Sequence, residues 1–110
     1  MNVNHTLKVL ANEPQGAGRY LLVAEAPGLA HAARPGQFVH VRCTAGTVPL
    51  LRRPFSFYRL RPAAGAVEIY YQVVGSGTEL LSRVPPGTTL SALGPLGRGF
   101  PLAPRARHIV

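Results

Sequence analysis

The sequence predicts an all-β fold, a small closed antiparallel barrel of six strands with one short helix before the last strand. The 110 residues support a single domain, and 46% of them are hydrophobic, which is enough for a packed core. Twelve glycines and eleven prolines favour short strands joined by tight turns over long helices. Apolar and polar residues also alternate in several short runs, as they do in strands with one buried face.

The expected strands span residues 5–11, 19–26, 37–43, 50–58, 67–74 and 88–93. The run 67–74 predicts a strand most clearly, because its odd-numbered residues from 67 to 73 are all apolar and line one face. Pro27-Gly28 is expected to end the second strand. Pro54 favours an edge strand for 50–58, because proline has no N–H to donate to a neighbouring strand.

The period of the hydrophobic pattern changes after residue 74. Residues 79–84 predict a short helix with Thr78 as its N-cap, which Pro85-Pro86-Gly87 ends. The next expected strand leads into a glycine-rich loop, Gly94-Pro95-Leu96-Gly97-Arg98-Gly99-Phe100. Residues 107–110 then look like an apolar strand that has only begun, so we expect a fragment of a longer protein.

The chain is strongly basic, with a formal charge of +8 from twelve basic and four acidic residues. Only one of the twelve is a lysine, Lys8. One interpretation is a general bias toward arginine. The other is that some arginines bind an anion, either a ligand phosphate or a nucleic-acid backbone, and composition does not choose between the two.

The residue types give little support to catalysis by side chains alone. The single cysteine, Cys43, excludes an intrachain disulfide, and we expect it to be a small core residue. There is no aspartate, and the glutamates and histidines are scattered, so we predict no catalytic residue and no metal site. Any chemistry would then be carried by a cofactor. No run is long enough to span a membrane and no signal peptide is recognisable, so we expect a cytoplasmic protein.

The first candidate site is the segment Leu51-Arg52-Arg53-Pro54-Phe55-Ser56. In an extended chain, Arg53 and Phe55 point to one side and Ser56 to the other. The arginine can then hold a phosphate while the aromatic ring packs against a ring system. The alternative is an edge strand with a solvated arginine and a core phenylalanine.

The second candidate site is Gly75-Ser76-Gly77-Thr78-Glu79-Leu80. Glycines before a helix let backbone N–H groups converge on an anion. The alternative is an ordinary strand-to-helix turn, and neither a GxGxxG nor a GxxxxGK[ST] motif is present. The glycine-rich segment 94–100 is the third: it indicates close backbone approach or positive φ angles, and the alternative is a flexible connector.

In this order and spacing, the segments resemble the electron-transfer subunit of class B dihydroorotate dehydrogenase, within the ferredoxin reductase-like flavoprotein superfamily. Arg53-Pro54-Phe55-Ser56 resembles the superfamily motif Arg-x-Tyr-Ser/Thr, with phenylalanine in place of tyrosine. Residues 73–78 resemble the segment before a phosphate-facing helix, and 94–100 is the most subfamily-like segment. The resemblance runs from Pro35-Gly36-Gln37-Phe38-Val39 through 94–100, about two-thirds of the chain.

The resemblance implies a six-stranded Greek-key barrel that binds FAD at its rim. On the first segment, the arginine would meet the pyrophosphate, and the other three residues would border the isoalloxazine and ribityl chain, with the serine near flavin N5. The middle of the expected strand 67–74 would present backbone groups to the flavin edge, and the turn after that strand would hold the pyrophosphate at the start of the helix. The implied FAD-binding residues are Arg53, Pro54, Phe55 and Ser56, then Tyr70, Tyr71 and Gln72, then Gly77 and Thr78.

The resemblance also implies features that this sequence lacks. The family continues into a nicotinamide nucleotide-binding domain and carries four cysteines for a [2Fe–2S] cluster. We therefore interpret 1–100 as the FAD-binding barrel and 101–110 as a linker and the first strand of a truncated nucleotide-binding domain. Full electron transfer by this piece alone is not expected.

The leading hypothesis is a flavin-dependent oxidoreductase subunit that links dihydroorotate oxidation to NAD in pyrimidine biosynthesis. Its partner would be the catalytic dihydroorotate dehydrogenase subunit, with NAD bound by the missing domain. The alternative in the same class is the flavin subunit of a related hydrogenase or ferredoxin:NADP oxidoreductase. The alternative from another functional class is that the chain is a small basic barrel that binds single-stranded nucleic acid. A third hypothesis is an interaction fragment that self-associates through apolar surface left exposed.

Overall fold

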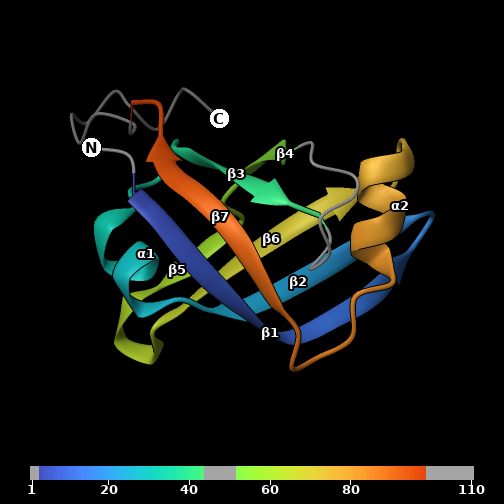
Figure 1. The fold of residues 1–110 in the computed structure, drawn as a ribbon, viewed down its shortest axis with the longest axis horizontal. Helices are drawn as coiled ribbons and strands as arrows, with labels where there is room; N and C mark the ends of the chain where they lie inside the picture. Colours follow the sequence, from blue (N-terminus) through green and yellow to red (C-terminus); the bar gives the residue numbers. More distant parts are fainter. Residues whose placement is uncertain (1–2, 44–51, 99–110) are drawn as a thin grey trace.

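The computed structural model describes residues 3–43 and 52–98, which form one seven-stranded antiparallel sheet and three short helices (Figure 1). The strands are β1 (Val3–Gly16), β2 (Arg19–Glu25), β3 (Phe38–Arg42), β4 (Arg52–Ser56), β5 (Arg59–Arg61), β6 (Ala66–Gln72) and β7 (Thr89–Leu96). The helices are α1 (Pro27–Ala32), the 3-10 turn η1 (Pro62–Ala64) and α2 (Ser76–Ser82).

The strand order is β4-β3-β7-β1-β2-β6-β5, and the sheet curls so that β4 comes to face β6. The ring of Phe55 on β4 meets the ring of Tyr71 on β6 edge to face, with 5.8 Å between the centroids. Side chains therefore complete the barrel at this point, where the described residues form no strand pair. The all-β antiparallel architecture predicted from the sequence is confirmed.

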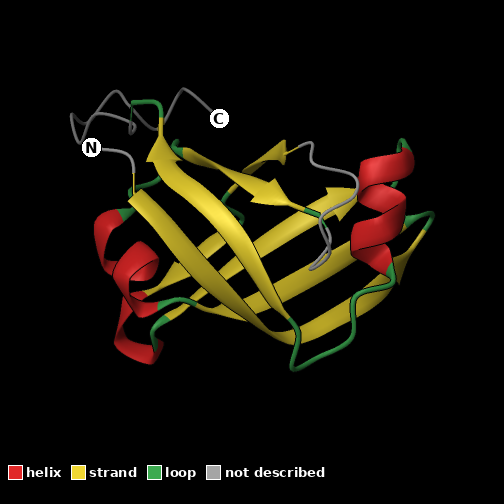
Figure 2. Ribbon diagram, viewed as in Figure 1, coloured by secondary structure: helices red, strands yellow, loops and turns green. Residues whose placement is uncertain are grey.

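The core lies inside the curled sheet and follows from the period-2 pattern of its strands. In β3, for example, Val39 and Val41 are fully buried, whereas the residues between them are only partly buried. The two α-helices lie at opposite ends of the sheet (Figure 2), and each places a fully buried leucine in the core, Leu29 from α1 and Leu81 from α2. Burying one such side chain stabilises the fold by about 1.5–3 kcal/mol. Cys43 is 1% exposed, so its predicted core position is confirmed.

The strand count differs from the expected six because a further strand, β5, follows the expected run 50–58. The middle part of that run pairs with β3 as β4, and the chain then bends so that the short β5 pairs with β6 instead. The change of partner begins at Tyr58, whose N–H donates to the carbonyl of Glu68 at 2.8 Å. The three residues of β5 are too few to show an alternation of residue types, so no periodic pattern predicted this strand.

Two helix predictions also need correction. Pro27 begins α1 and does not only end the preceding strand; proline fits the first turn of a helix, where its missing N–H has no helical acceptor in any case. Helix α2 begins at Ser76 and not at 79, so Gly75 is the N-cap residue and Thr78 is the third residue of the helix. The hydroxyl of Thr78 nonetheless accepts the N–H of Gly75 at 3.1 Å, as the third residue of a capping box does.

The glycine-rich segment is more ordered than a flexible connector at its first residues. Residues 94–96 belong to β7, although a loop was expected, and Gly97 has a φ of +79°. A Cβ atom on Gly97 would lie 2.9 Å from Cε1 of Phe38, so the expected close approach is present. The end of this segment and the expected second domain, residues 99–110, lie outside the described residues. Within the described ranges, no helix is long and apolar enough to cross a membrane.

Candidate functional site

A cavity of about 420 Å³ lies between β4, the end of β6 and the start of α2. Its lining residues are Arg53, Pro54, Phe55, Ser56, Tyr70, Tyr71, Gln72, Val74 and Thr78. An adjoining cavity of about 280 Å³ is lined by Arg53, Val74, Gly75, Gly77 and Thr78. Eight of the nine residues predicted from the sequence line the first cavity, and the ninth, Gly77, lines the second. The fold thus brings three separate segments to one place.

Two lining residues, Val74 and Gly75, were not among the predicted site residues. Gly75 lay inside the second candidate segment, and Val74 was assigned to the end of a strand. Val74 is 78% exposed, so it presents an apolar side chain beside the cavity. A further cavity of about 340 Å³ contains none of the predicted residues; it is lined by Pro35, Gly36, Phe57, Tyr58, Arg59 and Leu60.

The cavity follows a strand edge that is left unpaired in the described structure. On this side β6 pairs with β5 only from Ala66 to Glu68. The carbonyl of Glu68 points toward β5, where it accepts the N–H of Tyr58. Since alternate residues of an antiparallel strand direct their backbone groups to the same side, those of Tyr70 and Gln72 point into the cavity. The backbone of Tyr71 is directed the other way, toward Tyr20 on β2.

The inner wall of the cavity is aromatic. Phe55 and Tyr71 are 8% and 5% exposed, and Tyr20 stacks on Tyr71 with 5.7 Å between the ring centroids. Burial raises the pKa of Tyr71 well above its ordinary value, so the phenol stays neutral. Its hydroxyl donates to Oδ1 of Asn12 at 2.9 Å. This wall is suited to a flat ring system.

Arg53 supplies the positive charge. It lies opposite Val41 in the β3–β4 register and Phe55 lies opposite Val39, so both share the inward face of β4, as predicted. Arg53 itself is exposed, and it lies where β4 meets α2. A Cβ atom on Gly77 would lie 3.0 Å from Nε of Arg53, which shows that the arginine packs directly against the first turn of the helix.

The first turn of α2 is held by the hydroxyl of Thr78. Its Oγ1 accepts the N–H groups of Val74 at 2.8 Å and Gly75 at 3.1 Å, and donates to the carbonyl of Gly75 at 3.1 Å. The hydroxyl is therefore engaged within the protein, so any ligand contact from Thr78 falls to its backbone N–H. The first N–H groups of a helix have no acceptor within the helix, so they are free to meet an anion beside Arg53.

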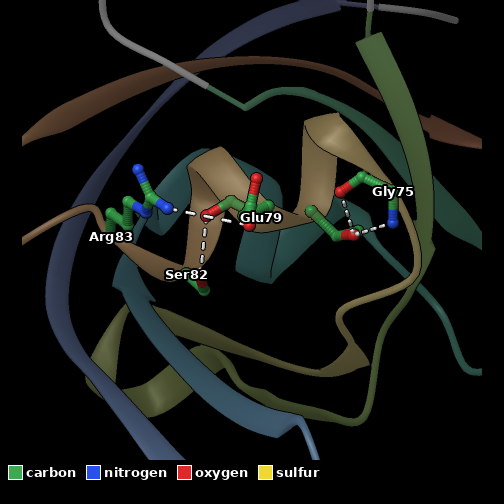
Figure 3. A network of polar contacts seen from close by, with 5 residues as sticks. Gly75, Glu79, Ser82 and Arg83 are labelled. Carbon is green, nitrogen blue, oxygen red and sulfur yellow. Dashed lines mark hydrogen bonds and ion pairs between the residues drawn. The ribbon is translucent and has the colours of Figure 1, made fainter.

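Acidic groups are directed away from this region. Glu79 pairs with Arg83 one turn later at 3.6 Å, and Ser82 Oγ donates to the Glu79 carbonyl at 2.6 Å (Figure 3). No aspartate or glutamate lines either cavity in the described part of the chain. The site as a whole therefore combines an aromatic wall, a free backbone edge and an uncompensated positive charge. This combination fits a flat heterocycle joined to a phosphate group.

Known proteins of similar sequence and structure share this arrangement of the chain. No family model matches the sequence. The dihydroorotate dehydrogenase B electron transfer subunit of Desulforamulus reducens is 46% identical over 95 residues, which are 86% of this chain and 36% of that protein. The subunit of the same name from Geobacillus sp. is 42% identical over 96 residues, 87% of this chain and 37% of that protein. The chain thus spans a little more than one third of the length of these relatives.

Two solved structures show the same fold. The NADH-dependent reduced ferredoxin-NADP oxidoreductase, described for flavin-based electron bifurcation, superimposes with a TM-score of 0.76 at 26% identity, covering 84% of this chain and 33% of that one. The ferredoxin reductase of carbazole 1,9a-dioxygenase in its FAD apo form gives a TM-score of 0.68 at 21% identity, covering 87% and 30%. The chain is therefore a homologue of part of the dihydroorotate dehydrogenase B electron transfer subunits, and its fold is that of ferredoxin reductase-like flavoproteins.

Proposed function

We propose that this chain is the FAD-binding part of an electron-transfer flavoprotein subunit that links dihydroorotate oxidation to NAD in pyrimidine biosynthesis. The convergence of Arg53, the open edge of β6 and the first turn of α2 around one cavity carries the proposal. The identity to subunits of that name supports it over a hydrogenase or ferredoxin:NADP oxidoreductase subunit.

The residues fit FAD in three parts. Arg53, with the backbone of Gly77 and Thr78, would hold the pyrophosphate. The segment 54–56 would border the isoalloxazine and ribityl chain, with its serine near flavin N5. Tyr70 and Gln72 would donate and accept hydrogen bonds along the ring edge, and the side chain of Tyr71 would back the ring. Bound FAD supplies the hydride and single-electron chemistry, and these residues bind and orient it.

The partners of the proposed function lie beyond the cavity. We propose a catalytic dihydroorotate dehydrogenase subunit as the partner, NAD bound by a further domain, and a [2Fe–2S] cluster held by cysteines outside this sequence. A cytoplasmic location is proposed with them, because the nicotinamide nucleotide pool that it would serve is there. Self-association of the 110-residue chain stays a prediction, which light scattering over a range of concentrations would check.

The first experiment is a titration of the purified chain with FAD, followed by absorbance and flavin fluorescence. Arg53→Ala should weaken FAD binding about tenfold or more, because a charge-assisted hydrogen bond to phosphate contributes about 1.5–3 kcal/mol. Arg83→Ala is the matched control. It removes an exposed arginine from the other end of α2, so FAD affinity should be unchanged.

Two outcomes would contradict the proposal. One is that the wild-type chain binds no FAD, and the other is that Arg53→Ala and Arg83→Ala bind it equally. Binding of a single-stranded oligonucleotide that weakens steeply with salt, without flavin binding, would instead support the basic-barrel alternative. Reduction of bound FAD by a catalytic dihydroorotate dehydrogenase subunit would distinguish the proposed partner from that of a hydrogenase.

A further inference from the structure

The side chain of Asn12 joins three parts of the protein that lie far apart in the sequence. Asn12 is on β1, where it pairs with Leu22 of β2. Its Oδ1 accepts the hydroxyl of Tyr71 at 2.9 Å, and its Nδ2 donates to the carbonyls of Leu81 at 2.8 Å and Val84 at 3.1 Å. We propose that Asn12 is a positioning residue that fixes the two walls of the cofactor cavity relative to each other. This inference rests on the proposed function.

One wall depends on α2, which cannot set its own position. The helix has seven residues and is about 10 Å long, and isolated helices of this length are marginal in water. Its first turn packs against Arg53, and at the end away from the cavity its orientation depends on the buried side chain of Leu81 and the amide of Asn12. Thr78, which lines the cavity, is carried by the same short helix. A shift of the last turn therefore moves the cavity wall.

The other wall is the aromatic surface around Tyr71. This ring stacks on Tyr20 and meets Phe55 edge to face, so the hydroxyl is the only part of the side chain that can anchor it by a hydrogen bond. Asn12 accepts that bond and is not itself among the residues that line the cavity. It acts on the site through Tyr71 and α2.

An asparagine is suited to this position by its chemistry. Its amide offers one acceptor and two donors, and the structure uses the acceptor for the phenol and the donors for the two carbonyls. Aspartate would keep the acceptor but would place a charged oxygen against two carbonyls. Alanine would leave the phenol without its acceptor and would remove one donor from each carbonyl, although the Leu81 carbonyl would keep the N–H of Val84.

The experiment compares Asn12→Ala, Asn12→Asp and Tyr71→Phe with the wild-type chain. We expect Asn12→Ala to weaken FAD binding about tenfold and to change the visible circular dichroism of the bound flavin. Asn12→Asp should behave similarly, and Tyr71→Phe should have a smaller effect, because it loses only one of the three bonds. Leu7→Val is the control, since it removes a methylene group from the core on the same strand and should lower stability without changing the flavin spectrum.

A second measurement, hydrogen exchange of the chain without flavin, tests the inference separately from the proposed function. In Asn12→Ala the amides of α2 should exchange at least tenfold faster relative to those of β3 and β7, which are not joined to Asn12. Faster exchange spread evenly over the sheet would overturn the inference, as would an unchanged flavin spectrum and affinity. If the wild-type chain binds no FAD, the proposed function fails, and the exchange result alone decides whether Asn12 positions α2.

Discussion

Gly77 allows the arginine of the candidate site to be tested without altering its charge. A Cβ atom there would lie 3.0 Å from Nε and 3.1 Å from Cγ of Arg53, so Gly77→Ala should displace the arginine. Gly77 lies within α2 and is not at a positive φ, so alanine should be neutral or stabilising for the helix by up to about 1 kcal/mol. We predict weaker FAD binding, by about tenfold, with a melting temperature that is unchanged or higher.

The control for Gly77→Ala is Ser82→Ala, which also places an alanine in this helix but at its last, half-buried residue. It should leave FAD affinity unchanged. If Gly77→Ala binds FAD as tightly as wild type, the packing of Arg53 against α2 is not needed for binding, and the proposed pyrophosphate contact would have to be abandoned. Isothermal titration and thermal denaturation on the same samples supply both readouts.

Cys43 gives a prediction about pH. Burial raises the pKa of this thiol, and Arg53 offsets the rise only in part. In the unfolded chain the thiol ionises near its ordinary pKa of about 8.5, whereas in the folded chain it does not. Stability should therefore be full below about pH 8.5 and fall as the pH rises toward the folded pKa, by about 1.4 kcal/mol per pH unit.

Cys43→Ala should flatten this dependence between about pH 9 and 10, as measured by urea denaturation at several pH values. Tyr71, whose pKa is also raised by burial, adds a decline of the same sign from about pH 10 upward, which should remain in the variant. An identical slope in wild type and Cys43→Ala below pH 10 would show that the thiol is not the titrating group.

The sequence predicted the positions of some site side chains but not the hydrogen bonds of others. That Arg53 and Phe55 share a face follows from strand alternation alone, and the β3–β4 register agrees with it. The Thr78 hydroxyl hydrogen-bonds to the turn that precedes α2 and so does not face the cavity. The proposed role of Asn12 depends on its contacts with Tyr71 and α2. Neither is visible in the order of residues, because both require atoms that only folding brings together.

Among the elements, the hairpin β5–β6 carries a buried carboxylate that can be tested. The side chain of Glu68 is 8% exposed and contacts Nε of Arg61 directly, while Nε of Arg59 lies 3.9 Å away. Arg61→Ala leaves this carboxylate with only the distant arginine, so we predict a loss of about 2 kcal/mol in unfolding free energy. Arg59→Ala should cost less than about 1 kcal/mol, because its pair is long and solvent-screened.

Urea denaturation of the two arginine variants, with m-values compared, checks this prediction. Equal losses for Arg59→Ala and Arg61→Ala would mean that the closer contact does not determine the stability of the hairpin. FAD affinity should be unaffected in both, because neither arginine lines the proposed cofactor cavity.

Strands β2, β3 and β6 were predicted within one or two residues of their observed bounds, whereas β1 runs on to Gly16 instead of ending at residue 11, and short elements were missed. β5 has three residues, too few to show a period, and it follows β4 after only two residues, where the chain bends and changes its pairing partner from β3 to β6. Helix α1 starts with Pro27, which is read equally well as the end of a strand or the first turn of a helix. Most residues of α1 are small, so they show no amphipathic pattern, and the helix is stabilised by packing against η1, β6 and β7.

For the whole molecule, FAD binding should be visible as stability. A ligand at 100 times its dissociation constant, bound only by the folded state, adds about 2.7 kcal/mol. For a chain of 110 residues this corresponds to a rise in melting temperature of roughly 10 °C. Riboflavin, which lacks the phosphate groups, should give a smaller rise, and Arg53→Ala should reduce the FAD effect toward the riboflavin value.

The formal charge of +8 requires that the effect of FAD be compared with that of a polyanion. A basic protein binds polyanions non-specifically, so the melting curve should also be taken with a single-stranded oligonucleotide at physiological salt. A rise with the oligonucleotide as large as that with FAD, and lost with added salt, would show that charge and not the cavity accounts for the effect.

The late start of β5 has a consequence for how this protein can evolve. If paired residues preceded Arg59 on β5, their main chain would occupy the place beside Tyr70 and Gln72 where the flavin edge is proposed to lie. The cofactor would then complete an unfinished sheet, much as an added peptide strand does in other proteins. Contacts made by main-chain atoms survive the replacement of almost any side chain except by proline. Mutation can therefore change residues 70 and 72 freely while the ligand that completes the sheet stays the same.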